Sequence, residues 1–281
     1  MIQTLQKIIS ALAGIILALQ ASIVAMPIQS QLAQVYQAPA FVQGKANKVY
    51  NADPVTVTFD SSVTAGNMVA VSVIWNSTSI SLNAITANCV SGNFVLLNNP
   101  TTSTYSAAQG YGIITTSGSC TVAADFSAIP GNARIIAHEI SGIDTGNPLD
   151  GNIMRSQENA GNGMDALTSG NISTTQNGDY IFGIAFDTGA GITGAAGTGF
   201  TSRLALDGGH GYRSEDQIQT SSGPIAATFT HSGSVYSDFI IGVMAFKSVG
   251  GTPPPLSAPV ISSFTPSPSS INSGQSSTLS W

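Results

Sequence analysis

The chain has 281 residues, a formal net charge of −6, 42% hydrophobic residues and only 8% charged residues. This length suits one large domain or two modest ones and suffices to bury a core. The scarcity of Lys and Arg argues against nucleic acid as a partner, because such binders need a basic surface to displace counterions. It also argues against coiled coils and long solvated helices, while the apolar content argues against disorder.

Residues 1–25 have the pattern of a secretory signal peptide, with Lys7 followed by the apolar or small-residue run Ile8–Leu19. The small residues up to Ala25 predict cleavage after that position. An uncleaved membrane anchor is the alternative, because Ile8–Met26 approaches the length that spans a bilayer. Both interpretations place the rest of the chain outside the cytoplasm, secreted or at the cell surface. We expect no membrane span after removal of the signal.

The two cysteines, Cys89 and Cys120, each lie in a region rich in Ser, Gly and Asn. In an oxidising compartment these residues are expected to pair as a disulfide. Closing the intervening loop would stabilise the fold by roughly 3–4 kcal/mol on the chain-entropy model. A metal site would need further thiol or imidazole ligands, and no histidine lies near either cysteine in the sequence.

Short runs of alternating apolar and polar residues extend from residue 49 to residue 248, bounded by turn-forming Gly, Asn and Pro residues. The run Met68–Trp75 is apolar on both faces, as in a central strand that is covered on both sides. This pattern predicts an all-β fold, an antiparallel two-sheet β-sandwich of jelly-roll type, preceded by a polar segment at residues 26–48. The other predicted strands are Phe94–Leu97, Tyr105–Thr116, Cys120–Phe126, Arg134–Ile140, Tyr180–Phe186, Phe200–Leu206, Ile225–Thr230 and Asp238–Phe246.

Residues 249–259 interrupt the strand pattern with a Pro-rich stretch that contains three consecutive prolines. Consecutive prolines fix an extended conformation, so this stretch is predicted to be a semi-rigid linker between domains. Residues 260–281 then begin a second β-like unit that is too short to form a core of its own. We expect this unit to be the truncated start of a further domain.

The last 21 residues, ISSFTPSPSSINSGQSSTLSW, resemble the opening strands of bacterial Ig-like repeats of the PKD/Big type. Residues 49–248 resemble an uncharacterised concanavalin-like or jelly-roll module of bacterial surface proteins, on stretches such as GNMVAVSVIW, AHEISGIDTGNPLDG and AATFTHSGSVYSDFIIGVMAFK. Such modules sit beside Ig-like or fibronectin-like repeats. The resemblance implies a secreted or cell-surface adhesive protein and brings no catalytic residues with it.

A Gly-rich stretch from Asp207 to Asp216 carries the densest group of polar functional side chains in the sequence. Binding residues often lie on such loops above a rigid sandwich. Here Tyr212 would stack on a sugar ring, and Arg213 and Asp207 would form hydrogen bonds to its hydroxyls. His210 belongs to the same candidate ligand-binding set, and the alternative is a solvated loop without a ligand.

Asp144, Asn147 and Asp150 are the candidate metal ligands, because they place oxygen donors on a short loop bent by Gly and Pro. Such a set suits Ca²⁺, a hard cation that prefers oxygen ligands. The alternative is that these side chains only form turns through hydrogen bonds to their own backbone. No other cofactor is expected.

The sequence carries neither the Gly-x-Ser-x-Gly nor the P-loop signature of common hydrolases. Glycoside hydrolysis would require a carboxylate pair, for which Asp207 with Glu215 or Asp216 is the candidate. His138 and Glu139 are neighbours in a predicted strand, so their side chains should point to opposite faces and not act together.

These observations predict a non-catalytic, secreted or cell-surface β-sandwich module for adhesion or carbohydrate binding, linked to Ig-like repeats. Its partner would be an extracellular glycan or another cell-surface component. One alternative is a secreted carbohydrate-active enzyme of jelly-roll type. The other is a purely structural stalk or a virion decoration domain.

Overall fold

The computed structural model describes residues 37–97, 100–160, 167–188, 195–206, 211–230 and 237–250, and the short segments 265–267 and 278–280. The expected signal peptide lies outside these residues, as do most of the expected linker and of the unit that follows it. The all-β prediction is confirmed, since every strand pair in the described part of the chain is antiparallel. Within these same ranges, no helix has the length and apolarity needed to cross a membrane.

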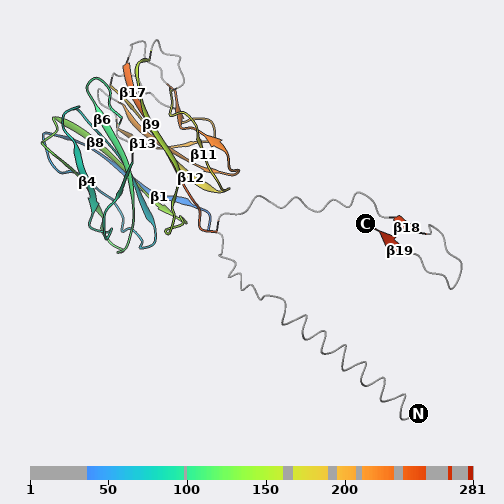
Figure 1. Ribbon diagram of the computed structural model, residues 1–281. Helices are drawn as coiled ribbons and strands as arrows, with labels where there is room; N and C mark the ends of the chain where they lie inside the picture. The colour runs from blue at the N-terminus through green and yellow to red at the C-terminus, as the bar shows by residue number, and fades with distance from the viewer. Residues whose placement is uncertain are drawn as a thin grey trace, which may run out of the picture.

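Two five-stranded sheets form the body of the molecule (Figure 1). Sheet I contains, in spatial order, β1 (Ala40–Tyr50), β8 (Asn132–Ser141), β3 (Met68–Trp75), β6 (Ser106–Ile113) and β5 (Val95–Leu97). Sheet II contains, in spatial order, β13 (Thr201–Leu206), β14 (Tyr212–Gln219), β12 (Asp179–Asp187), β17 (Ser237–Phe246) and β9 (Leu149–Ala160). The spatial order differs from the chain order, so strands that are distant in sequence lie side by side in both sheets.

Smaller strands extend this body. Sheet III contains β2 (Val55–Thr58), β7 (Thr121–Phe126) and β4 (Leu82–Ala87). The two-stranded pairs are β10 (Leu167–Thr168) with β16 (Thr228–Phe229), β11 (Ile172–Ser173) with β15 (Pro224–Ile225), and β18 (Thr265–Ser267) with β19 (Thr278–Ser280). The molecule is thus sandwich-like, with a third sheet beside the two that the sequence predicts.

Alternation along β3 explains why this strand is buried on both faces, as predicted. Val69, Val71 and Val73 pack into a hydrophobic cluster with residues of sheet III. Met68 and Ile74 point the other way, into a cluster with residues of sheet II. Sheet I is therefore the middle layer, and its strands need apolar side chains on both faces.

Strand β12 is the corresponding strand of sheet II, and all its residues are buried. Phe182 and Phe186 face sheet I, whereas Ile181 and Ala185 face a third cluster that includes residues of β10 and β16. The short strand pairs thus cover the outer face of sheet II, and the core continues through successive layers.

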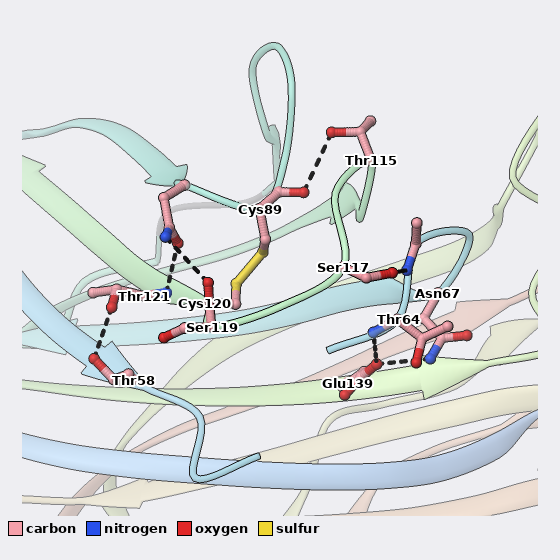
Figure 2. Close-up of a disulfide and its surroundings, with 12 residues drawn as sticks. Thr58, Thr64, Asn67, Cys89, Thr115, Ser117, Ser119, Cys120, Thr121 and Glu139 are labelled. Atoms are coloured by element: carbon pink, nitrogen blue, oxygen red, sulfur yellow. Dashed lines mark hydrogen bonds between the residues drawn. A yellow bond between two sulfur atoms is a disulfide. The ribbon is translucent and has the colours of Figure 1, made fainter. Parts of the chain in front are cut away.

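The predicted disulfide is present between Cys89 and Cys120, with a Cα–Cα separation of 5.3 Å (Figure 2). Both residues are buried; Cys89 follows β4, and Cys120 precedes β7, its partner strand in sheet III. The Phe59 amide donates a hydrogen bond to the Cys120 carbonyl over 3.1 Å, and the Thr115 amide donates to the Cys89 carbonyl over 2.9 Å. The disulfide and these two hydrogen bonds therefore connect one end of sheet III to the adjoining turns.

Several described strands occupy stretches that the sequence does not mark as strands, and three of them, β1, β9 and β14, matter for the sites below. β1 begins at Ala40, within the segment expected to be polar and before the expected start of the sandwich. It is an edge strand of sheet I with mostly half-buried residues, so polar side chains are tolerated there. β9 and β14 also replace expected loops, and both carry the residues of the sites described below.

Gly183 in β12 provides a test of the packing on the outer face of sheet II. A Cβ atom at this position would lie 2.7 Å from the Ala227 Cβ and 2.9 Å from the Glu215 Cγ. We therefore expect Gly183→Ala to lower the free energy of unfolding by about 1–3 kcal/mol, because overpacking forces its neighbours to move. Urea-induced unfolding measures this change. Gly131→Ala is the matched control, since no atom lies within 4 Å of the added Cβ, and an equal loss in both variants would contradict the packing.

Candidate functional site

The β1–β13 pocket is a cavity of about 350 Å³ between the edge of sheet I and the edge of sheet II. Both edge strands are irregular here, with a register shift between Phe41 and Gln43 in β1 and another between Ser202 and Leu204 in β13. Such bulges redirect side chains at sheet edges. The pocket is lined by residues that include Pro39, Phe41, Thr201, Arg203, Asp216 and Gln217.

An ion pair forms one wall of the β1–β13 pocket. The Arg203 Nε donates a hydrogen bond to the Asp216 Oδ2 over 2.8 Å, and the two side chains are 31% and 4% exposed. The Arg203 guanidinium also lies over the Phe41 ring, 4.3 Å from its centroid. The Arg203 guanidinium is therefore held in one orientation by both the Asp216 carboxylate and the Phe41 ring.

A chain of hydrogen bonds continues from Asp216 into the space between sheets I and II. The Tyr180 hydroxyl donates to the Asp216 Oδ2 over 2.5 Å and lies 3.3 Å from the His138 Nδ1. The Ser214 Oγ lies 2.9 Å from the His138 Nε2. Because the single proton of Tyr180 goes to Asp216, His138 donates through Nδ1 and accepts from Ser214 through Nε2. The four residues thus form one directional relay that ends at the pocket.

The Ser214–His138 pair has the separation of a nucleophile and its general base, but its surroundings differ from those of an active site. Both residues are fully buried, and the His138 ring packs against Phe41 and Phe182. Burial lowers the pKa of the His138 imidazole to about 3, and the positive charge of Arg203 adds to this effect. The imidazole is neutral and shielded from solvent, so the relay positions Asp216 rather than activating Ser214.

Glu215 and Asp216 point to opposite faces of β14, as period-two alternation requires. The Glu215 carboxylate faces the outer side of sheet II, where it accepts hydrogen bonds from the amides of Gly197 and Thr228 over 2.8 and 3.1 Å. Burial raises the pKa of Glu215 to about 7, although these two amides oppose the rise. The two neighbouring acids therefore do not form a pair across one substrate.

His138 and Glu139 also point to opposite faces, as the sequence predicts. Glu139 faces away from sheet II and accepts hydrogen bonds from the Gln43 and Asn67 side chains, each over 2.7 Å. The Thr64 amide donates to the same carboxylate over 2.9 Å (Figure 2). Glu139 thus anchors the turn before β3 and takes no part in the β1–β13 pocket.

The predicted ligand-binding residues are only partly within the described chain. Asp207 and His210 lie outside the described residues. Tyr212 lies on β14 and is 0% exposed, in the cluster between sheets I and II, with its ring centroid 6.0 Å from that of Phe186. Its ring has no solvent-facing side on which a sugar could stack. Arg213, the next residue of β14, is half-buried.

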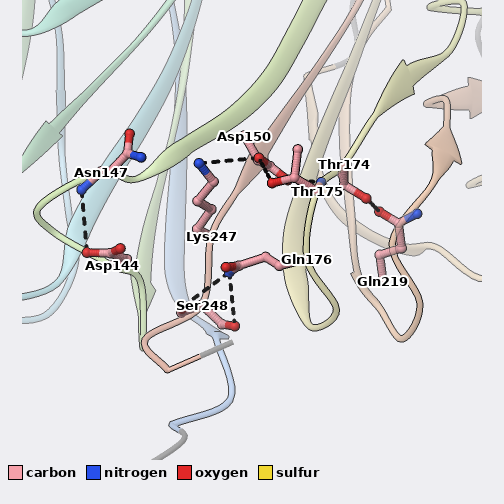
Figure 3. Close-up of polar contacts among 9 residues, drawn as sticks. All are labelled: Asp144, Asn147, Asp150, Thr174, Thr175, Gln176, Gln219, Lys247 and Ser248. Carbon is pink, nitrogen blue, oxygen red and sulfur yellow. Dashed lines mark hydrogen bonds and ion pairs between the residues drawn. The ribbon is translucent and has the colours of Figure 1, made fainter. Parts of the chain in front are cut away.

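The candidate metal ligands have separate partners (Figure 3). The Asp144 Oδ1 accepts hydrogen bonds from the amides of Gly146 and Asn147 over 3.0 and 3.4 Å, which is the turn-forming arrangement. Asp150 instead points towards Thr175 and Lys247. In the described ranges no group of three or more His, Cys, Asp or Glu side chains is arranged to hold a metal ion.

Sequence reasoning named Asp216, but as a candidate member of a carboxylate pair, and it missed Phe41 and Arg203. These three residues come from three strands, and only the rarity of charged residues within strands could have pointed to Arg203. Comparison with known proteins found no matching family model, no matching curated protein and no matching solved structure.

Proposed function

We propose that this chain is a non-catalytic extracellular module that binds a glycan in the β1–β13 pocket. The observation that carries the proposal is the nearly buried Asp216 carboxylate, fixed by Arg203 and Tyr180 in the wall of this pocket. An oriented carboxylate accepts hydrogen bonds from sugar hydroxyls, and Arg203 donates to them. The cavity volume lies at the lower end of the range for small-molecule sites.

The remaining lining of the pocket favours an uncharged, hydroxyl-rich ligand. Thr201 and Gln217 supply further hydrogen-bonding groups, and the Phe41 ring offers an apolar surface for the C–H face of a sugar. Arg203 and Asp216 neutralise each other, so the pocket has little net charge to attract an ion. Among the described residues that line the pocket, Asp216 is the only carboxylate, which supports binding rather than glycoside hydrolysis.

Two features support placing this module outside the cytoplasm. The Cys89–Cys120 disulfide is typical of an oxidising compartment. Residues 1–25 have the pattern of an export signal. The antiparallel pairing of β18 with β19 is compatible with a following Ig-like domain, and a jelly-roll relationship for the preceding sandwich belongs to the same proposal.

Glycan binding by the full chain is the test of this function. We expect binding to at least one immobilised glycan on an array, and we expect Thr201→Val and Gln217→Ala each to weaken that binding about tenfold. Each variant removes hydrogen bonds worth about 1–1.5 kcal/mol, and 1.4 kcal/mol corresponds to a factor of ten. Isothermal titration calorimetry with the selected glycan measures the change in Kd.

Thr145→Val is the matched control, because Thr145 lines a separate cavity of about 340 Å³ beside β5 and β6. This variant should bind the glycan as the unaltered chain does. Binding that is unaffected by Thr201→Val and Gln217→Ala would place the ligand elsewhere. A chain that binds no glycan on the array would contradict the proposed function itself.

A further inference from the structure

Lys247, Asp150 and Asp179 meet at one end of sheet II, although they are far apart in the sequence. Strand β17 lies between β12 and β9, and its last residue, Phe246, pairs with Tyr180 on one side and Leu149 on the other. Because Phe246, Tyr180 and Leu149 are the chain neighbours of Lys247, Asp179 and Asp150, this register brings the latter three positions to the same end of the sheet. The Lys247 Nζ lies 3.4 Å from the Asp150 Oδ1, and the two side chains are 19% and 2% exposed (Figure 3).

The backbone around Lys247 is fixed on both sides. The Lys247 amide donates a hydrogen bond to the Pro148 carbonyl over 2.7 Å, and the Asp144 amide donates to the Lys247 carbonyl over 2.8 Å. Because its backbone is fixed, the Lys247 side chain is held beside Asp150 by the fold, and no loop movement is needed to bring the two groups together. Such fixed proximity of two reacting groups contributes strongly to reaction rates.

Thr175 donates hydrogen bonds to both oxygens of the Asp150 carboxyl group. Its hydroxyl donates to Oδ1 over 2.6 Å, and its backbone amide donates to Oδ2. Donors placed in this way polarise the Cγ–O bonds and stabilise negative charge that develops on oxygen when a nucleophile adds to Cγ. The Asp150 carboxyl group thus faces the Lys247 side chain with donors already in place on both of its oxygens.

Asp179 supplies an acid beside this pair. It is fully buried, and both carboxyl oxygens lack a hydrogen-bond partner in the described part of the chain. Burial, and then the neighbouring Asp150, raise the pKa of Asp179 to about 8. The nearby Gln176 side chain, which donates to Ser248, offsets only part of this rise. Asp179 therefore carries a proton near neutral pH and can exchange it with its neighbours.

We propose that Lys247 and Asp150 become joined by an intramolecular amide bond between Nζ and Cγ, with Asp179 as the proton-transferring group. The Lys247 ammonium first loses a proton to the carboxyl pair, and the lone pair of Nζ then adds to the Asp150 Cγ. A further Nζ proton passes through Asp179 to one oxygen of Asp150. The bond from Cγ to that oxygen breaks, and the oxygen leaves as water.

The balance of this step is one ammonium and one carboxylate converted into one amide and one water molecule. Asp179 ends in the protonation state in which it began, and neither oxidant nor other co-reactant is required. The new bond would link β9 covalently to the end of β17, the last strand of sheet II along the chain. It would hold these strands together when a force or a protease acts on the region that follows β17. This inference does not depend on the β1–β13 pocket.

The mass of the full folded chain tests the proposal. We expect the unaltered chain to weigh one water molecule less than its composition with the Cys89–Cys120 disulfide formed. Peptide mapping should show the peptide that contains Asp150 joined to the peptide that contains Lys247, with no tryptic cleavage after Lys247. Lys247→Arg, which keeps the positive charge, and Asp179→Asn should both have the full mass. Lys48→Arg, on the edge strand β1 of sheet I, is the matched control and should retain the joined peptides.

Asp150 precedes Gly151, and an aspartyl–glycyl pair can also lose water by cyclising on its own backbone. That reaction does not need Lys247, so water loss that persists in Lys247→Arg would overturn the proposal. A full mass for the folded, unaltered chain after prolonged incubation would overturn it as well. Circular dichroism confirms that each variant is folded, and if Asp179→Asn does not fold, the comparison with Lys247→Arg decides the matter.

Discussion

Replacing both Cys89 and Cys120 with alanine is expected to lower the free energy of unfolding by about 3–4 kcal/mol. The disulfide closes a loop with a sequence separation of 31, and its loss frees the unfolded chain to adopt many more conformations. Alanine is preferred to serine for this test because both positions are buried and a hydroxyl would add its own desolvation cost. Urea-induced unfolding of the two proteins without reductant measures the difference.

The loss of stability in the double variant should be concentrated in sheet III. The carbonyl groups of Cys89 and Cys120 accept backbone hydrogen bonds from the turns around that sheet, so these amides should lose protection in hydrogen exchange. Reductant should lower the stability of the unaltered chain by a similar amount and leave the double variant unchanged. Equal stability of the oxidised chain and the double variant would show that the loop is constrained by other contacts.

Strands β3 and β12 show why part of the fold could be predicted from the sequence. Each is covered on both faces, so nearly every residue must be apolar or small, and the run stands out in the chain. The disulfide could be predicted too, because the chain has only two cysteines. In these cases the local composition alone carries the information.

Strand β14 shows why another part could not be predicted. Its sequence contains Ser214, Glu215 and Asp216 in succession, which is typical of a loop, yet all three residues are buried. Their polar groups are satisfied by partners on other segments, such as His138, Gly197 and Tyr180. Burial of polar groups with distant partners leaves no local signal in the sequence.

The candidate sites follow the same rule. Asp150 could be singled out from its own loop, but its partners Lys247 and Asp179 are brought to it only by the strand order of sheet II. Likewise, Phe41 and Arg203 meet because β1 and β13 are neighbouring edges with bulges. A site that depends on tertiary pairing appears only once the register of the strands is known.

His138 is expected to make the folded chain sensitive to acid. Its pKa is about 3 in the folded chain, against 6.5 for an ordinary histidine, because it is fully buried beside the charge of Arg203. As the pH falls from 6.5, the unfolded chain takes up a proton that the folded chain does not, so stability is lost progressively. Between pH 6.5 and about 4, this effect amounts to about 3 kcal/mol, at about 1.4 kcal/mol for each pH unit.

The difference between the unaltered chain and His138→Gln isolates this contribution. Glu215 and Asp179 have raised pKa values of about 7 and about 8, so these acids make the folded state lose stability as the pH rises and act in the opposite direction. They are present in both proteins and cancel in the difference. Urea-induced unfolding at a series of pH values should show that the unaltered chain loses about 3 kcal/mol more than the variant on acidification.

Arg203→Gln provides the control for the cause of the shift. Without the guanidinium, the pKa of His138 should rise but stay below its ordinary value, because burial is the larger cause. The acid-dependent loss should then shrink without disappearing. Parallel pH profiles for the unaltered chain and His138→Gln would mean that the imidazole is protonated in the folded state. The hydrogen-bond relay from Ser214 to Asp216 would then need a different arrangement, because a doubly protonated ring cannot accept from Ser214.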